Sequence, residues 1–193
     1  MYKITFTLLL LLAFACERSM TFREFEQDVF DQVFIDVVDA TYRDKRLTEL
    51  FPEDDRRISK EDFNSIEKQI KISRYRVIRD SLRNDTLDLV IAVSNKGNIN
   101  EKSDLRRYDT RKFRFKKYSE LPVESNLDNW SDKYPKFMGV MSFSDIRFNK
   151  EKSVGELDVS YSCGGKCGFG FTVSVYKSHG SWRVKKVVQT WIA

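Results

Sequence analysis

The stretch Leu157–Val175, LDVSYSCGGKCGFGFTVSV, holds two runs of alternating apolar and small or polar residues on either side of a glycine-rich break. The apolar positions of the two runs are Leu157, Val159, Tyr161, Phe169, Phe171, Val173 and Val175. A period of two predicts β-strands that each bury one face. Because the break is too short for a crossover, the two strands are predicted to be antiparallel neighbours.

The same pattern extends in both directions from this stretch. Four successive strands are predicted at Phe137–Phe148, Val154–Ser162, Gly168–Lys177 and Ser181–Ile192. The short breaks between them predict an antiparallel meander. Two earlier strands are predicted at Thr86–Val93 and Lys112–Tyr118, and the loop at Ser119–Pro135 is expected to dock Trp130 and Tyr134.

Two helices are predicted before the strands. The segment that starts at Thr21 carries apolar residues in steps of three, four and one, at Phe22, Phe25, Val29, Phe30, Val33, Phe34, Val37 and Val38. These positions form one stripe of an α-helix, and Thr21 with Glu24 forms a capping box at its start. A second helix is predicted from Ser59 to Leu82, with Phe63, Ile66, Ile70 and Val77 on one face.

These elements predict an α+β fold, in which a long N-terminal helix and a second helix pack on a curved antiparallel sheet. The plan is similar to the cone-shaped nuclear-transport-factor-like and cystatin-like folds, an analogy that carries no function. Residues 16–193 are expected to form a single domain, mainly helical over 16–85 and mainly sheet over 86–193.

The chain begins MYKITFTLLLLLAFAC, which has the arrangement of a secretory signal peptide over residues 1–15. Lys3 supplies the positive charge, an apolar run follows, and Ala13 and Ala15 supply the small residues of a cleavage site. The apolar run is shorter than the roughly 20 residues that a spanning helix requires. We therefore expect export to the cell envelope without a retained transmembrane helix.

Cys16 directly follows the predicted signal. Ala13-Phe14-Ala15-Cys16 resembles the lipobox of bacterial lipoproteins, although the usual leucine is displaced by one residue, to Leu12. The resemblance implies that Cys16 is acylated and anchors the mature protein to the membrane, on the periplasmic or the surface side. The alternative is ordinary cleavage after Ala15, which would leave an odd exposed thiol in an oxidising compartment.

The net charge of +5 does not point to nucleic acid. Basic and acidic residues are interleaved along the chain, as in RDKRLTELFPEDDRR, which is typical of solvated surfaces. The expected partners are the lipid membrane, through the acylated Cys16, and an envelope protein.

The C-terminal quarter, FSDIRFNKEKSVGELDVSYSCGGKCGFGFTVSVYKSHGSWRVKKVVQTWIA, resembles the tail of a group of uncharacterised exported proteins and lipoproteins of the Bacteroidetes type. In that group a Cys-Gly-Gly-x-Cys-Gly turn precedes a strand, a glycine-containing hairpin and a terminal Trp-Ile/Val motif. The corresponding features here are Cys163–Gly168, Gly180, Trp182 and Trp191-Ile192. The resemblance supports an envelope address and the fold, and it implies no activity.

The glycine-rich break does not match a phosphate, metal or redox motif. It lacks the glycine and lysine spacing of a P-loop, and it precedes a strand where a phosphate site requires a helix N-terminus. It offers two thiolates, whereas a zinc site needs four ligands. Its cysteine spacing is C-x₃-C, whereas the redox motif is C-x-x-C. A disulfide between Cys163 and Cys167 is therefore predicted, with free buried thiols as the alternative. The residues Gly164, Gly165, Lys166 and Phe169 are candidates for a binding rim around this turn.

No catalytic residue, metal site or cofactor is predicted. His179 is the single histidine and lies in a predicted hairpin turn. The function favoured by the sequence is a non-enzymatic, membrane-anchored binding or scaffolding module for a protein or a small envelope ligand. The alternative is an envelope hydrolase that uses one of the acidic pairs Asp28/Asp31, Asp54-Asp55 or Glu61-Asp62 in the mouth of the sheet.

Overall fold

The computed structural model describes residues 20–49, 66–121, 130, 133–164 and 167–193. The helices are α2 (Phe22–Thr41), α3 (Lys45–Glu49) and α4 (Ile66–Asn84), with short 3-10 helices η3 (Leu105–Tyr108) and η4 (Tyr118–Glu120). The strands are β1 (Leu89–Val93), β2 (Phe113–Lys117), β3 (Phe137–Phe143), β4 (Arg147–Phe148), β5 (Val154–Gly164), β6 (Cys167–Ser178) and β7 (Ser181–Ile192). The predicted signal segment 1–15 and Cys16 lie outside the described residues.

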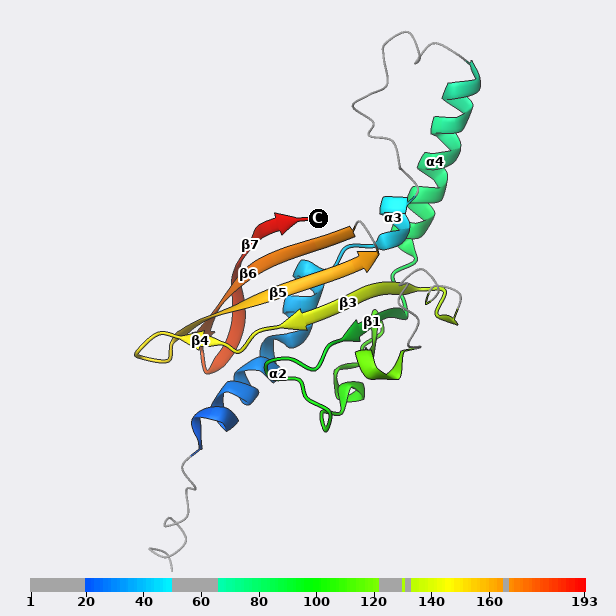
Figure 1. Cartoon of the computed structure of the whole chain (residues 1–193). Helices are drawn as coiled ribbons and strands as arrows, with labels where there is room; N and C mark the ends of the chain where they lie inside the picture. Colours follow the sequence, from blue (N-terminus) through cyan, green and yellow to red (C-terminus); the bar gives the residue numbers. More distant parts are fainter. Residues whose placement is uncertain (1–19, 50–65, 122–129, 131–132, 165–166) are drawn as a thin grey trace, which may run out of the picture.

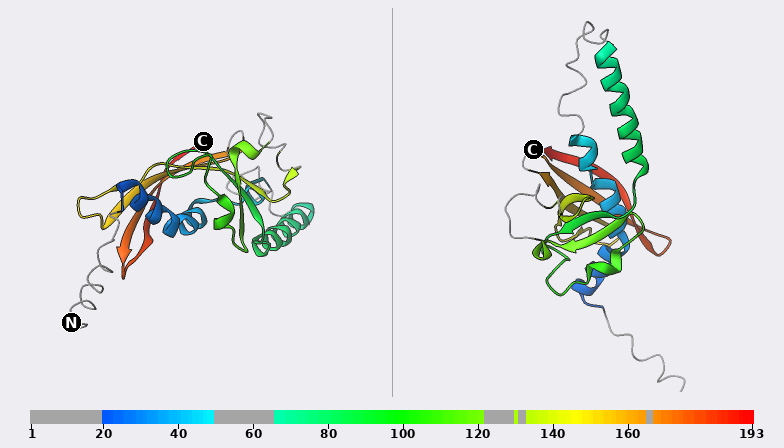
Figure 2. Two further views of the ribbon diagram at one scale, coloured as in Figure 1. Left: turned by 90° about the horizontal axis from the view of Figure 1, so that it is seen from below. Right: turned by 90° about the vertical axis from the view of Figure 1, so that its right-hand side faces the viewer.

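The strands form one open sheet of seven strands in the order β2-β1-β3-β5-β6-β7, and β4 pairs with β5 off this path (Figure 1). Together with the helices, this sheet confirms the α+β class. In Figure 2 the sheet curves around α2, which lies against one of its faces.

The predicted C-terminal meander is confirmed, because β3, β5, β6 and β7 are successive antiparallel neighbours. The alternating residues of the two central strands pair directly across the ladder, as in Leu157 with Val173 and Tyr161 with Phe169. The predicted strand Phe137–Phe148 is divided into β3 and β4. Between them the backbone N–H of Ile146 donates to the Glu26 carboxylate at 2.6 Å, and so is not available to a neighbouring strand.

The two strands before the meander differ from the all-antiparallel sheet that was predicted. β1 is parallel to β2 on one side and to β3 on the other. The physical reason is the length of the connections, since residues 94–112 and 118–136 are each long enough for the crossover that parallel neighbours require. The prediction rested on the short breaks of the C-terminal strands, which do not apply here.

The apolar stripe of α2 supplies the helical half of the main core. Its buried members are Val29, Phe30, Val33, Phe34, Val37 and Val38. They pack against buried residues of the inner sheet face such as Ile91, Phe143 and Val173. The predicted capping box is present, with Thr21 and Glu24 exchanging hydrogen bonds at the start of the helix. Helix and sheet therefore form around one core.

A buried carboxylate fixes the first turns of α2. Glu26 is 3% exposed and accepts hydrogen bonds from the backbone N–H of Ile146 and, at 3.2 Å, from the Asn98 side chain. Arg23 lies 3.5 Å from the same carboxylate and 3.1 Å from Asp145. These contacts join α2 to the loops that follow β1 and β3.

A second, smaller cluster covers the opposite face of β1 and β3. Its buried members are Ala92, Leu121, Trp130 and Phe137, with Val90, Tyr134 and Val140 packed around them. The predicted docking of Trp130 and Tyr134 is thus confirmed. The sheet is covered by α2 on one face and partly by this aromatic segment on the other.

The second predicted helix is present as α4, whose described part begins at Ile66. Figure 1 shows that α4 extends from α3 beyond the sheet, and Ile70 and Val77 on its predicted apolar face are 50% and 70% exposed. The predicted cap at Ser59 and the residue Phe63 lie outside the described residues. No helix in the described part of the chain combines the length and the apolarity needed to cross a membrane.

Gly139 marks a close approach between β3 and β5. Its φ is +148°, and a Cβ atom at this position would lie 2.3 Å from the backbone oxygen of Ser162. Gly180 in the β6–β7 turn also has a positive φ, of +85°, but a Cβ atom there would meet no atom within 4 Å. A side chain at Gly139 would therefore meet both an unfavourable backbone conformation and a steric clash. A side chain at Gly180 would meet the unfavourable conformation alone.

We expect Gly139→Ala to lower the free energy of unfolding by about 3 kcal/mol or more, because both the conformation and the backbone contact are violated. Gly180→Ala is the matched control and is expected to cost about 1 kcal/mol. Urea unfolding of the two variants measures the difference. Equal losses would contradict the close packing of β3 against β5.

Candidate functional site

The β5–β6 turn brings the two C-terminal cysteines together. Cys163 and Cys167 are at disulfide distance, with their Cα atoms 5.1 Å apart, and Cys163 is fully buried on the core side. Two of the predicted rim residues, Gly165 and Lys166, lie outside the described residues. The turn closes the end of the sheet that is next to the C-terminus of α2 (Figure 1).

A row of aromatic rings starts beside this turn on the inner face of the sheet. The rings of Tyr161 and Phe169 are stacked with their centroids 6.3 Å apart, and those of Phe169 and Phe171 are 6.4 Å apart. Tyr161 and Phe171 are buried, whereas Phe169 is only half-buried. The row therefore ends in a partly accessible apolar surface.

Arg43, in the turn between α2 and α3, covers this surface. Its guanidinium carbon lies 5.2 Å from the centroid of Phe171 and 5.8 Å from that of Phe169, within the range of cation–π attraction. One guanidinium nitrogen donates to the backbone oxygen of Tyr42 at 3.0 Å. Among the described residues, no carboxylate lies within ion-pairing distance of Arg43. Within the described part of the chain, its positive charge is therefore not neutralised by an ion pair.

Arg43, Asp44, Leu47 and Phe169 line an open hollow of about 240 Å³. We call these four residues the Arg43 hollow. Ile192 on β7 pairs with Phe169 in the ladder and is 66% exposed, so it extends the apolar floor beside the hollow. The lining combines one cation, one carboxylate and an apolar base.

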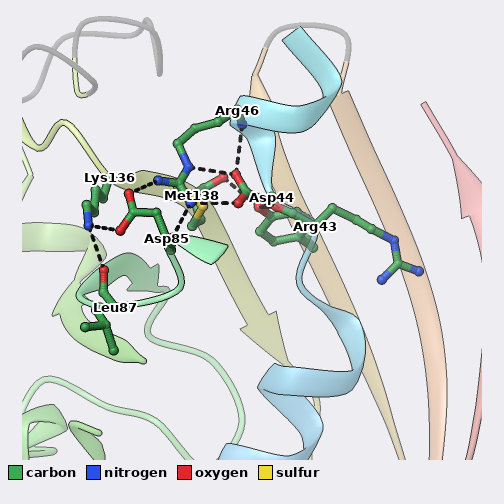
Figure 3. A network of polar contacts seen from close by, with 8 residues as sticks. Arg43, Asp44, Arg46, Asp85, Leu87, Lys136 and Met138 are labelled. Carbon is green, nitrogen blue, oxygen red and sulfur yellow. Dashed lines mark hydrogen bonds and ion pairs between the residues drawn. The ribbon is translucent and has the colours of Figure 1, made fainter. Parts of the chain in front are cut away.

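A network of charged groups fixes the chain on the other side of Arg43 (Figure 3). Arg46 binds Asp44 through two guanidinium nitrogens at 2.8 and 3.0 Å, and it binds the Asp85 carboxylate at 2.9 Å. Lys136 binds the other oxygen of Asp85 at 2.6 Å. The side chain of Arg43 points away from this network in Figure 3.

The network shifts the acid–base properties of its members in consistent directions. The hydrogen bond from Lys136 and the one from Arg46 lower the pKa of Asp85. The hydrogen bond to Asp44, with smaller contributions from Asp85, raises the pKa of Arg46. Both shifts favour the charged forms of Asp85 and Arg46 at neutral pH. The ion pairs tie α3 to the end of α4 and to the start of β3.

Tyr161, on the sheet, binds the backbone of the turn between α2 and α3 that carries Arg43. Its hydroxyl lies 2.6 Å from the backbone oxygens of Arg43 and of Met138, and it donates its single proton to one of them at a time. Burial raises the pKa of Tyr161, so the hydroxyl keeps that proton at neutral pH. The backbone of Arg43 is thus attached to the sheet directly below its own side chain.

The remaining candidates from the sequence do not join this site. Asp28 and Asp31 have separate partners, since Asp28 accepts from Gln32 while Asp31 accepts from Gln27 and Tyr108. The pairs Asp54-Asp55 and Glu61-Asp62 lie outside the described residues.

His179 occupies the β6–β7 turn, as predicted, with a φ of +50°. The described residues contain no group of three or more His, Cys, Asp or Glu side chains that could hold a metal ion.

The sequence pointed to Phe169 but not to Arg43 and its supports. The segment YRDKR at 42–46 directly follows the apolar stripe of α2, and its mixed charges were interpreted as solvated surface. Asp85 and Lys136, which complete the network, are distant in the sequence.

No family model, no curated protein and no solved structure matches the chain.

We expect Arg46→Ala to lower the free energy of unfolding by about 1–3 kcal/mol at pH 7, because Asp44 is only 10% exposed and would lose the two hydrogen bonds from the Arg46 guanidinium. The pKa of Asp85 is lowered in the folded protein, so its contribution is present at neutral pH and is lost as the pH falls below about 4. The difference between the variant and the wild type should therefore shrink at pH 3. Chemical unfolding at both pH values measures it, and a difference independent of pH would contradict the network.

Proposed function

We propose that this protein is a non-enzymatic, membrane-anchored binding module of the cell envelope, and that the Arg43 hollow is its binding site. The observation that carries the proposal is the position of Arg43. Its guanidinium lies over Phe169 and Phe171 with no carboxylate within reach among the described residues. A buried structural arginine is usually paired, whereas a ligand-binding arginine keeps its charge for the ligand.

The chemistry of the hollow selects the kind of ligand group. A guanidinium binds a carboxylate or a phosphate through two parallel hydrogen bonds. Next to it, Leu47 and Phe169 offer an apolar surface, which Ile192 extends. The ligand group that fits is therefore an anion attached to an apolar body, on a partner protein or on a small envelope molecule.

The surroundings of the hollow favour binding because they are already ordered. Arg46 and its two acidic partners fix the chain after Arg43, and the Tyr161 hydroxyl fixes the backbone of Arg43 itself. The Cys163–Cys167 pair holds the strand ends that carry Phe169. Binding to a preorganised site loses little conformational entropy, so even a small hollow can give useful affinity.

The anchor in this proposal comes from the sequence. Cys163 and Cys167 lie together, which leaves Cys16 as the third cysteine of the chain. Acylation of Cys16 after removal of residues 1–15 would hold the domain at the membrane and would account for that cysteine. The alternative of an envelope hydrolase requires two carboxylates in one cleft. Among the described residues, the Arg43 hollow is lined by a single carboxylate, Asp44, which is bound to Arg46.

The proposal is tested by affinity capture of partners from envelope membranes with the intact protein, followed by their identification. We expect Arg43→Ala to lose the specific partner, because the anion loses the guanidinium that the described residues supply to the hollow. Arg111→Ala is the control for the loss of one positive charge, since Arg111 is exposed and precedes β2, and it does not line the hollow. Equal capture by the wild type and by Arg43→Ala would contradict the proposed site.

A second arm of the experiment tests the turn. Replacement of both Cys163 and Cys167 by Ser removes the constraint on the strand ends that carry Phe169, and should weaken capture of the same partner. Unchanged capture by this variant would show that the turn has a structural role only, while leaving the Arg43 hollow to be judged by the first arm.

A further inference from the structure

The end of α2 opposite the Arg43 hollow carries a second surface of distinct composition. It consists of the start of α2 with the residue Met20 before it, the β4–β5 turn and the β6–β7 turn, which lie at the same end of the molecule in Figure 1 and in the left view of Figure 2. We define it by the residues Met20, Phe22, Lys150, Lys152, Lys177 and Arg183, all of which are exposed. We call it the basic–aromatic face.

We propose that the basic–aromatic face docks onto the anionic headgroups of the membrane that holds the protein. The proposal rests on the anchor at Cys16, and it adds an orientation that the anchor alone does not give. The Arg43 hollow is then directed away from the bilayer, into the surrounding compartment.

Specific contacts bring the three segments of this face together. The rings of Phe22 and Phe148 meet edge to face with centroids 6.1 Å apart, and the amine of Lys152 lies 5.4 Å from the centroid of Phe22. The backbone N–H of Lys177 donates to the oxygen of Ser153 at 3.0 Å, which joins the β6–β7 hairpin to the β4–β5 turn. The face is thus one continuous surface built on the folded core.

The composition of the face suits a lipid surface. Met20 and Phe22 are 59% and 53% exposed, and exposed apolar and aromatic side chains favour the headgroup boundary. The stretch YKSHGSWR at 176–183 contains no acidic residue, and the β4–β5 turn contains a single one, Glu151. Each Lys or Arg held near an anionic membrane contributes about 1 kcal/mol of attraction.

Two ion pairs nearer the sheet leave this excess unchanged, because each of them is neutral overall. Arg147 binds Asp158 at 2.8 Å and Arg23 binds Asp145 at 3.1 Å. Glu24 stays negative, because Thr21, its partner in the capping box, is neutral, so Glu24 and Glu151 stand against the four basic side chains of the face. The unpaired charge on the outermost turns is therefore mainly positive.

The short segment between an acylated Cys16 and α2, here called the tether, places this face next to the membrane. Only four residues separate Cys16 from Thr21, so the chain can extend at most about 18 Å between them. α2 has 20 residues and spans about 30 Å, which places the Arg43 hollow beyond the reach of the tether. An acylated Cys16 therefore keeps the basic–aromatic face close to the headgroups. The positive charge of the face then determines whether it binds them.

The test measures the reactivity of individual lysines in the intact acylated protein, reconstituted into vesicles and treated with a neutral amine-reactive label. Vesicles of phosphatidylglycerol are compared with vesicles of phosphatidylcholine, both of which retain the lipid anchor. We expect Lys150, Lys152 and Lys177 to react about threefold more slowly, or slower still, in phosphatidylglycerol. Lys133 lies before β3, at the end of the molecule that carries the hollow, and should react equally in both.

Charge-reversed variants identify the cause of the protection. In Lys150→Glu with Lys177→Glu, Lys152 should react equally in the two lipids. In the matched variant Lys185→Glu with Lys186→Glu, which changes the net charge by the same amount on exposed positions of β7, Lys152 should remain protected.

The mass of the N-terminal peptide separates failure of this inference from failure of the anchor. An acylated Cys16 with equal reactivity of Lys152 in both lipids would overturn the docking and leave the proposed binding function intact. An unmodified Cys16 at the mature N-terminus would overturn the anchor, and with it the orientation that depends on the tether.

Discussion

Burial of the α2 stripe against the curved sheet is the interaction on which the rest of the structure depends. Val29, Phe30, Val33 and Phe34 are at most 1% exposed, and each such side chain contributes roughly 1.5–3 kcal/mol by leaving water. The buried stripe continues almost to the end of the helix, at Val37 and Val38, so α2 is fixed from its second turn to its C-terminus. The packing of α2 against the sheet therefore fixes the positions of both ends of the helix.

The helix thereby separates two surfaces of different composition. At its first turns the buried Glu26 joins α2 to the loops after β1 and β3, and the exposed residues there are aromatic and basic. At its last turn the chain leaves the core and presents Arg43 above the rings of Phe169 and Phe171. A helix of about 30 Å would keep the proposed ligand site at one end independent of the proposed membrane contact at the other.

The sequence was most informative where structure depends on local pattern. The alternation around Tyr161 and Phe169, the capping box at Thr21 and the stripe of α2 predicted the meander and the main helix, because each uses only neighbouring residues. The parallel position of β1 depends on partners more than 20 residues away, which periodicity does not record. The class of fold was therefore predictable, while the order and direction of the first strands were not.

The site was predictable in part for the same reason. Phe169 could be proposed because it follows the glycine-rich turn. Arg43 could not, because its role depends on support from Asp85 and Lys136, which come from other elements of the chain. In the sequence, the charges of 42–46 look like those of any exposed segment. Only their arrangement shows that Arg46 is paired twice while Arg43 has no carboxylate beside it in the described part of the chain.

The position of Arg43 is the central claim, and its proton resonances in the folded, unliganded protein test it most directly. Protons of a side chain that lies over aromatic faces are shifted upfield by the ring currents. With the guanidinium carbon 5.2 and 5.8 Å from the two ring centroids, the Arg43 Hδ and Hε signals should lie upfield of their positions in the unfolded protein. Signals at the unfolded positions would show that Arg43 is free in solvent, and would contradict the preformed hollow.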